Sequence, residues 1–306
     1  MSQRNLASYI GGLTERVGRG AVPSNITYSY LILGGAVLWF VVFLVIPLLM
    51  LVVSSFMSFE NYSIVYELTI DQYQNVMNVT FFNAMVLTFL YGVAVVAISL
   101  LIGYPLAYYL RFYLSFTQSL FVFLLLLIPF FTMEVVRMYS VFSVLGKLGV
   151  VNKLLLEVGL IDAPLSLMFT RISVVWGYLL NYSVFMTGPI FISLTQVEDE
   201  HIDTAKIFCG TPISIFRSVI WPMSLPGVTI GTFLVFLLTI GNFLVPRLLS
   251  SGKGQITSYL FTLVNQGVNY PAAAAVSVFL MIPVLVLIVV LNHLVDITEP
   301  FKSGRS

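Results

Sequence analysis

Six long apolar stretches constrain what this chain can fold into. The first, Leu31–Val53, has 23 residues without a charge and would be about 34 Å long as a helix, enough to cross a bilayer. It is too long for the apolar part of a cleavable signal, so we expect it to remain as the first span. Apolar residues make up 59% of the chain and charged residues 9%, a balance that few water-soluble folds tolerate. The sequence therefore predicts an all-α integral membrane protein.

We predict six transmembrane helices, at residues 30–54, 82–110, 118–140, 170–194, 227–249 and 272–295. Six prolines lie within these spans or near their ends: Pro47, Pro105, Pro129, Pro189, Pro246 and Pro283. Breaks in a membrane helix are tolerated where neighbouring helices or water satisfy the freed backbone groups. Bent spans around a moving path would explain these prolines. The ordinary enrichment of proline in membrane helices explains them equally well.

Lys and Arg residues predict an orientation. The N-terminal tail, residues 1–29, carries Arg4, Arg16 and Arg19, whereas the loop after the first span carries neither Lys nor Arg. The positive-inside rule then places this tail in the cytoplasm. With six spans, the C-terminal tail, residues 296–306, is also expected to be cytoplasmic.

The segment 198–227 is the longest polar interruption between two apolar stretches. Gly210 suits a helix C-terminus, Thr211 an N-cap and Pro212 the first position of a new helix. This second short helix is expected to end at two prolines, Pro222 and Pro226. The pattern predicts an ordered pair of cytoplasmic helices, which indicates a surface presented to a partner.

Signatures of catalysis are absent from the sequence. HExxH, GxSxG, CxxC and the phosphate-binding GxxxxGK[ST] do not occur. A single cysteine, Cys209, excludes an internal disulfide and a cysteine-based metal cluster. The net charge of +1 offers no basic patch for nucleic acid. We predict that the chain is not an enzyme and has no metal, no cofactor and no nucleic-acid partner.

The polar segment also carries a family pattern. Asp203-Thr204-Ala205 stands where a characteristic loop reads Glu-Ala-Ala, and Cys209 stands where that loop has glycine. Its second half matches at Phe216–Pro222, and further matches occur at Gly103–Ala107, Leu148–Asn152, Gly241–Phe243 and Pro246–Leu249. Over residues 30–295 the chain resembles the transmembrane permease subunits of ABC importers, in the branch that includes the spermidine/putrescine permeases.

This resemblance implies a type I importer permease in a cell inner membrane, with residues 198–227 as its cytoplasmic coupling loop. The loop would dock on cytoplasmic ABC ATPase subunits, which bind the ATP. The implied coupling residues are Glu200, Asp203, Thr204, Ala205, Cys209, Gly210 and Thr211. The other implied partners are a second permease, homologous or identical, an extracytoplasmic solute-binding protein, a small-molecule solute and membrane lipid.

Charged and polar side chains within the spans are candidates for the solute path. Glu134 and Arg137 lie three residues apart on one helical face, and such charges in a membrane usually face protein or water. An ion pair between them explains their presence equally well. Further candidates that could offer hydrogen bonds or a cation-attracting ring are Tyr139, Asn181, Tyr182 and Asn242. Packing between helices is the alternative for these four.

Polyamine is the leading solute, on resemblance alone. Relatives in the same branch import opine-like compounds, organophosphonates or ferric iron, so these stay open. A secondary transporter is a further alternative from another class. It would need an internal repeat with paired broken helices and a buried ionisable relay, and we find no convincing repeat in this sequence.

Overall fold

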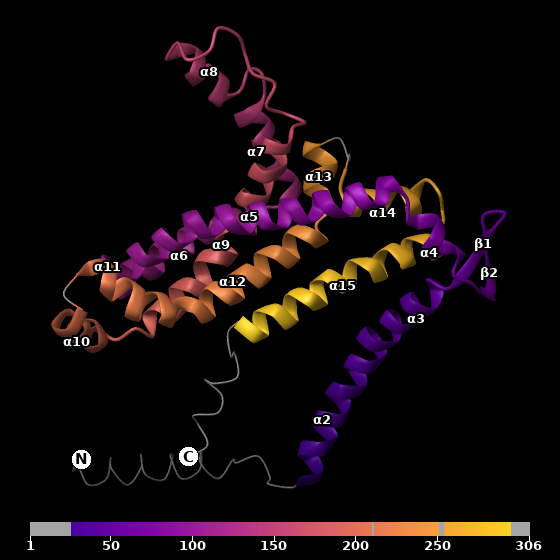
Figure 1. Cartoon of the computed structure of the whole chain (residues 1–306), viewed down its shortest axis with the longest axis horizontal. Helices are drawn as coiled ribbons and strands as arrows, with labels where there is room; N and C mark the ends of the chain where they lie inside the picture. The colour runs from indigo at the N-terminus through magenta and orange to yellow at the C-terminus, as the bar shows by residue number, and fades with distance from the viewer. Residues whose placement is uncertain (1–25, 210, 251–253, 295–306) are drawn as a thin grey trace, which may run out of the picture. The chain divides into compact units, whose positions relative to one another are not determined.

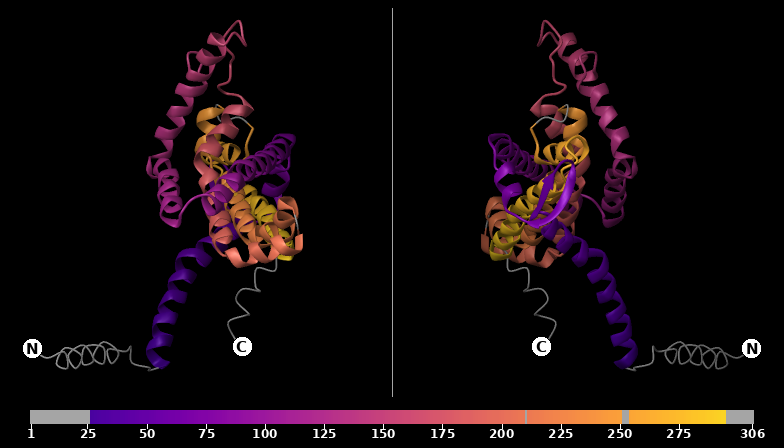
Figure 2. Two further views of the ribbon diagram at one scale, coloured as in Figure 1. Left: turned by 90° about the vertical axis from the view of Figure 1, so that its left-hand side faces the viewer. Right: turned by 90° about the vertical axis from the view of Figure 1, so that its right-hand side faces the viewer.

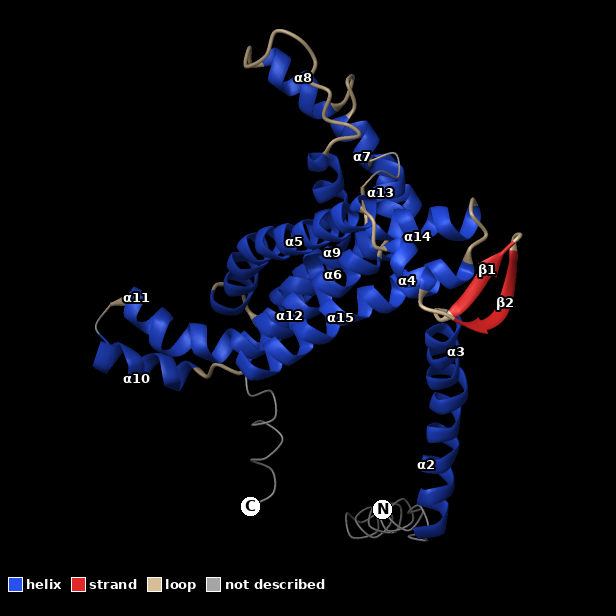
Figure 3. Cartoon of the chain, turned by 45° about the vertical axis from the view of Figure 1, so that its right-hand side comes forward, coloured by secondary structure: helices blue, strands red, loops and turns tan. Residues whose placement is uncertain are grey.

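The computed structural model describes residues 26–209, 211–250 and 254–294 of the 306-residue chain. The described residues are mostly helical (Figure 3). They divide into two compact units, residues 1–54 and 55–306, and each is described here by itself. Residues 1–25 and 295–306, which include most of both predicted tails, lie outside the described part.

The first unit is a helix interrupted by one π-turn. It consists of α2 (Ile26–Phe40), the π-turn η1 (Val41–Val45) and α3 (Ile46–Ser54). No residue of α3 is buried within the chain. With a mean hydropathy of 3.1 over the window Leu33–Ser54, this helix coincides with the first predicted span.

Three long helices form the centre of the second unit: α5 (Val79–Phe112), α9 (Arg171–Thr195) and α12 (Trp221–Gly241). They pack side by side (Figures 1 and 2). Glycines permit the close approach, because a Cβ at Gly103 would lie 2.9 Å from Thr187 Oγ1 and one at Gly231 would lie 2.9 Å from Met186 Sδ. Small residues at helix crossings are the usual means of tight packing in membranes.

A smaller group of elements surrounds the beginning of α5. It contains the antiparallel hairpin of β1 (Met57–Glu60) and β2 (Ser63–Leu68), and the helices α4 (Asp71–Val76), α14 (Ile256–Asn265) and α15 (Tyr270–Leu294). Val76, Phe81 and Ile256 share a second apolar core there with residues of α15. The hairpin lies in the loop after the first predicted span, for which no strands were predicted.

Six helices are long and apolar enough to cross a membrane among the described residues, as predicted, but the third is displaced. The expected span 118–140 is two helices, α6 (Phe116–Phe131) and α7 (Glu134–Leu145), separated by an extended Thr132 and Met133. The apolar window instead runs on through α7 into α8 (Val150–Glu157). Figures 1 and 2 show α8 set apart from the three central helices.

The helices around the polar segment depart from the prediction in a second way. After α10 (Asp199–Cys209), the chain runs as one helical stretch through α11 (Pro212–Ile215), the π-turn η2 (Phe216–Ile220) and α12. The expected stop at Pro222 and Pro226 is therefore wrong. A π-turn explains this, because the backbone N–H of Trp221 bonds to Phe216 O, one residue beyond α-helical spacing. The wider turn makes room for the proline ring that follows.

The fifth predicted span, 227–249, is also interrupted. Helix α12 ends at Gly241, Asn242 is extended, and α13 (Leu244–Leu249) continues in a separate short helix. Two of the predicted spans are thus broken in the described structure, one between α6 and α7 and one between α12 and α13. Both lie next to α9.

Candidate functional site

Four predicted path residues meet where the two broken helices lie against α9. Glu134 is the first residue of α7, Asn242 separates α12 from α13, and Asn181 and Tyr182 lie on α9. We call Glu134, Asn181, Tyr182 and Asn242 the Glu134 cluster. Helix breaks free backbone groups and polar side chains for other contacts, and membrane proteins tolerate them where they line a cavity or are buried in protein.

Hydrogen bonds fix the geometry of the Glu134 cluster. Glu134 Oε1 accepts from Asn181 Nδ2 at 3.0 Å and from Asn242 Nδ2 at 2.6 Å. Asn242 Nδ2 also donates to the Tyr182 hydroxyl at 2.7 Å. The amide orientation of Asn242 is set from its other side, since its Oδ1 accepts from the backbone N–H of Val245 at 2.9 Å. Asn242 therefore bonds to the first turn of α13 while it also holds the carboxylate.

The carboxylate of Glu134 has neutral donors but no cationic partner in the described part of the chain. Its position in the first turn of α7 is favoured by the positive end of the helix dipole. Asn181 and Tyr182 are only 2% and 8% exposed. The cluster thus holds a negative charge beside buried polar groups and leaves it without an opposite charge.

Arg137 does not supply that opposite charge. Its guanidinium lies over the ring of Phe130, 5.5 Å from the centroid, and its Nε and Nη1 are buried without a hydrogen-bond partner among the described residues. The alternative of an ion pair between Glu134 and Arg137 is therefore not realised there. Tyr139, the sixth predicted path residue, is 62% exposed and contacts Phe142 rather than the cluster.

Gln255, the residue just before α14, lies near the Glu134 cluster and was not among the predicted site residues. Gln255 is 2% exposed and accepts from the Tyr178 hydroxyl at 2.7 Å, while its Nε2 is buried with no described partner. Tyr178 stacks on Tyr182, with 6.1 Å between ring centroids. Asn181 Oδ1 is a further buried atom that has no hydrogen-bond partner among the described residues. Most buried polar atoms in proteins are satisfied, so these unsatisfied atoms distinguish this region from the rest of the described structure.

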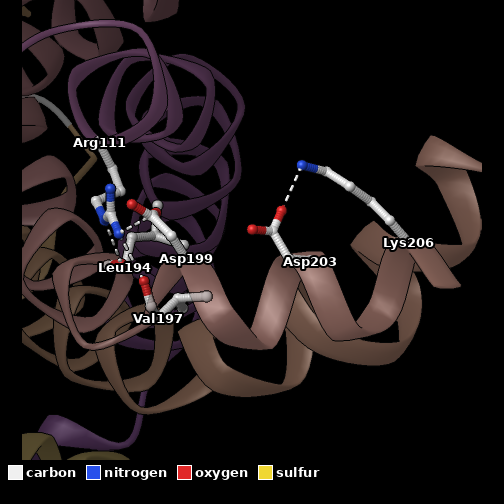
Figure 4. A network of polar contacts seen from close by, with 6 residues as sticks. All are labelled: Arg111, Leu194, Val197, Asp199, Asp203 and Lys206. Carbon is white, nitrogen blue, oxygen red and sulfur yellow. Dashed lines mark hydrogen bonds and ion pairs between the residues drawn. The ribbon is translucent and has the colours of Figure 1, made fainter.

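The predicted coupling residues occupy α10 and the start of α11. Ile202 and Ala205 face the interior, whereas Glu200, Asp203, Thr204 and Ile207 are exposed. We call these last four residues the α10 stripe, since positions i, i+3, i+4 and i+7 lie on one helical face. Asp203 bonds to Lys206 at 2.8 Å, and both side chains are exposed (Figure 4). Ile207 is 80% exposed. No sequence motif had singled out Ile207.

The remaining coupling candidates lie at the turn after α10. Thr211 caps α11, with its Oγ1 accepting from the backbone N–H of Ser214 at 3.3 Å, and Pro212 takes the first helical position, as predicted. Gly210 and the side chain of Cys209 lie outside the described residues. Ala205 is 6% exposed, so its side chain packs against the rest of the protein.

Comparisons with known proteins bear on both regions. A family model described as "Binding-protein-dependent transport system inner membrane component" matches residues 95–303. The chain is 28% identical over 249 residues to the spermidine/putrescine transport system permease protein PotB of Escherichia coli K12, covering 80% of this chain and 89% of the relative. PotB of Haemophilus influenzae is 29% identical over 261 residues, covering 82% of this chain and 88% of the relative. The inner membrane ABC transporter permease protein YdcU of E. coli K12 is 26% identical over 273 residues, covering 84% and 86%.

Solved structures give the same fold. A chain in the crystal structure of a bacterial alginate ABC transporter, in complex with an alginate pentasaccharide-bound periplasmic protein, superposes with a TM-score of 0.67. The match covers 90% of this chain and 94% of the other, at 18% identity. The predicted fold class, a helical membrane permease of the ABC importer type, is confirmed.

Proposed function

Because the chain belongs to the family of binding-protein-dependent transport system inner membrane components, we propose that it forms the membrane path by which an ABC importer takes up polyamines. The chain is the permease subunit of a binding-protein-dependent ABC importer in an inner membrane, and ATP hydrolysis belongs to a separate subunit. A binding protein delivers the solute. The polyamine substrate and the residues that meet it are the proposed part.

The unpaired carboxylate of Glu134 carries the proposal. Two amide groups hold its Oε1 in place, at 3.0 and 2.6 Å, but neutral donors leave the charge uncompensated. A primary or secondary ammonium group would supply both the missing charge and further donors, and charge-assisted hydrogen bonds are the stronger kind. The ring of Tyr182, whose hydroxyl accepts from Asn242, adds a face that attracts cations. The names of the relatives at 28–29% identity support the same solute class.

One observation favours a second class of solute. The buried Nε and Nη1 of Arg137 lack acceptors among the described residues, and a carboxylate or phosphonate oxygen would satisfy them. A solute with an amine and an anionic group, as in opine-like compounds or aminophosphonates, would engage Glu134 and Arg137 together. Competition for uptake separates the two candidates, because a polyamine path is blocked by spermidine and putrescine and not by the zwitterionic compounds.

The α10 stripe is proposed as the docking face for the ATPase, with α10 and both chain termini in the cytoplasm. Three of its residues are polar and one is a large apolar side chain, a composition typical of a docking surface with an anchor residue. We further propose that a second permease, homologous or identical, completes the path.

Charge reversal at Asp203 and a charge at Ile207 are expected to weaken ATPase binding. Burying an isoleucine contributes about 1.5–3 kcal/mol, so Ile207→Asp should lower the affinity by roughly tenfold or more. Asp203→Lys is expected to act in the same direction. The measurement is co-purification of the ATPase with the permease, together with the ATP hydrolysis of the assembled complex.

His201→Gln is the matched control, since His201 is exposed on α10 but lies beside the stripe. It should bind the ATPase normally. Normal binding by both stripe variants, in protein that is otherwise well folded, would refute the docking face.

A further inference from the structure

The side chain of Arg111 connects three elements that are distant in the sequence. Arg111 lies in the last turn of α5 and is 22% exposed. Its Nε donates to Leu194 O at 3.2 Å, and its Nη2 donates to Val197 O at 2.7 Å. The same Nη2 lies 3.0 Å from Oδ1 of Asp199, the first residue of α10 (Figure 4). We call this group the Arg111 clamp.

The chemistry of the clamp suits its place at the end of α9. The last carbonyls of a helix have no partner within it, and a cation is favoured there by the negative end of the helix dipole. The planar guanidinium supplies two donors in a fixed arrangement. Leu194 and Val197 are fully buried, so this part of the clamp is anchored in the core. The Asp199 side chain is 83% exposed, and its ion pair is the weaker part.

The clamp provides a connection that the chain itself does not make. Helix α10 follows α9 directly, and it leads through α11 and η2 into α12. Helix α5, the third central helix, has no such direct route to α10. Arg111 provides one, because it holds α5 to the end of α9 and to the first residue of α10 at the same time.

We infer that Arg111 is a positioning residue that makes α5 move together with α10. This inference rests on the proposed function, in which the ATPase displaces α10. A displacement passed along the chain reaches α9 and α12 directly and reaches α5 only through its packing on them, whereas the clamp joins α5 to α10 itself. All three central helices would then change position as one unit, as rigid-body switching of a transporter requires.

The test uses the complete transporter in proteoliposomes and measures solute moved per ATP hydrolysed. Arg111→Gln is expected to lower this ratio about fivefold or more, within the range of coupling between distant sites, while the ATPase still binds. Arg111→Lys should be intermediate, since a lysine lacks the planar fork. Asp199→Asn should lose less than Arg111→Gln, because both carbonyl contacts remain. Lys153→Gln is the matched control, because it also removes a positive charge, lies on α8 away from the coupling loop, and is exposed with no side-chain hydrogen bond or ion pair to a described residue.

A distance measurement separates positioning from general stability. Spin labels at two exposed residues, Tyr109 on α5 and His201 on α10, in a Cys209→Ser background, should give a broader distance distribution with Arg111→Gln than with Lys153→Gln. If the glutamine variant does not accumulate, Arg111→Lys serves for both measurements. A loss of yield alone, with ratio and distances unchanged in the surviving protein, would overturn the inference.

The outcomes also separate this inference from the proposed function. If the α10 stripe variants lose the ATPase but Arg111→Gln keeps the wild-type ratio, only the role of the clamp is overturned. If the stripe variants and the Arg111 variants all transport normally, both the role of the clamp and the docking of the ATPase on α10 are refuted.

Discussion

Glu134→Gln should lower transport of spermidine by about ten- to a hundredfold. The substitution keeps the size of the side chain and removes its charge, so an ammonium group loses a charge-assisted hydrogen bond worth about 1.5–3 kcal/mol. The amide oxygen can still accept from Asn181 and Asn242, which now bond to Oε1 of the carboxylate. Fold and assembly should therefore survive. The measurement is uptake of labelled spermidine into proteoliposomes that contain the ATPase and are supplied with the binding protein.

Glu157→Gln is the control for Glu134→Gln. Glu157 is exposed at the end of α8, so the same chemical change there should leave uptake within about twofold, as for most surface substitutions. Equal losses in the two variants would indicate a general effect of charge on the protein. Normal uptake by Glu134→Gln would remove the carboxylate from the solute path.

Gly227→Ala should destabilise the permease by about 1–3 kcal/mol or more, the usual cost of overpacking. A Cβ at Gly227 would meet the carbonyl oxygen of Pro189 and would lie 2.6 Å from Ser193 Oγ. The carbonyl belongs to the backbone of α9 and cannot rotate away, so α9 and α12 would have to separate. We expect a lower midpoint of thermal unfolding in detergent and a lower yield of assembled transporter.

The control for this packing prediction lies in the same helix. A Cβ at Gly241 would have no atom within 4 Å, so Gly241→Ala should leave the thermal midpoint close to that of the unsubstituted protein. A midpoint for Gly227→Ala that matches the Gly241→Ala value would contradict the close packing of α9 and α12.

Hydrophobic length was enough to predict the class of fold and most of the spans. The predicted spans 82–110, 170–194 and 272–295 correspond to α5, α9 and α15, because an apolar run that crosses a membrane must be helical to satisfy its backbone. The error at Pro222 and Pro226 has a physical reason. A π-turn ends at Ile220, just before Pro222, and another ends at Val45, just before Pro47. Proline marks a local change of helix type here, which the residue alone does not reveal.

The breaks inside the third and fifth predicted spans could not be predicted from hydropathy either. An apolar window averages over Thr132 and Met133, and it likewise averages over Asn242, so neither break changes its mean. The same averaging hid the fact that Glu134 follows one break while Asn242 forms the other.

The candidate site was predictable as a set of residue types but not as a set of contacts. Glu134, Asn181, Tyr182 and Asn242 were chosen because polar groups in a membrane need partners, and the structure brings these four together. Tyr139 was chosen by the same reasoning and lies apart from them. Gln255 and Ile207 were missed because an isolated glutamine in a loop and an isoleucine in a short helix are ordinary, and only their burial and exposure distinguish them. The roles of all these residues stay predictions.

We propose that this permease moves polyamines and that Glu134 takes part. The most direct measurement is the ATP hydrolysis of the reconstituted transporter with its binding protein, with and without spermidine, compared between the unsubstituted permease and Glu134→Gln. Spermidine should stimulate hydrolysis and drive uptake in the unsubstituted transporter, whereas the Glu134→Gln transporter should lose most of the uptake. The proposal would be contradicted if spermidine and putrescine produced neither stimulation nor uptake in a transporter that responds to another solute.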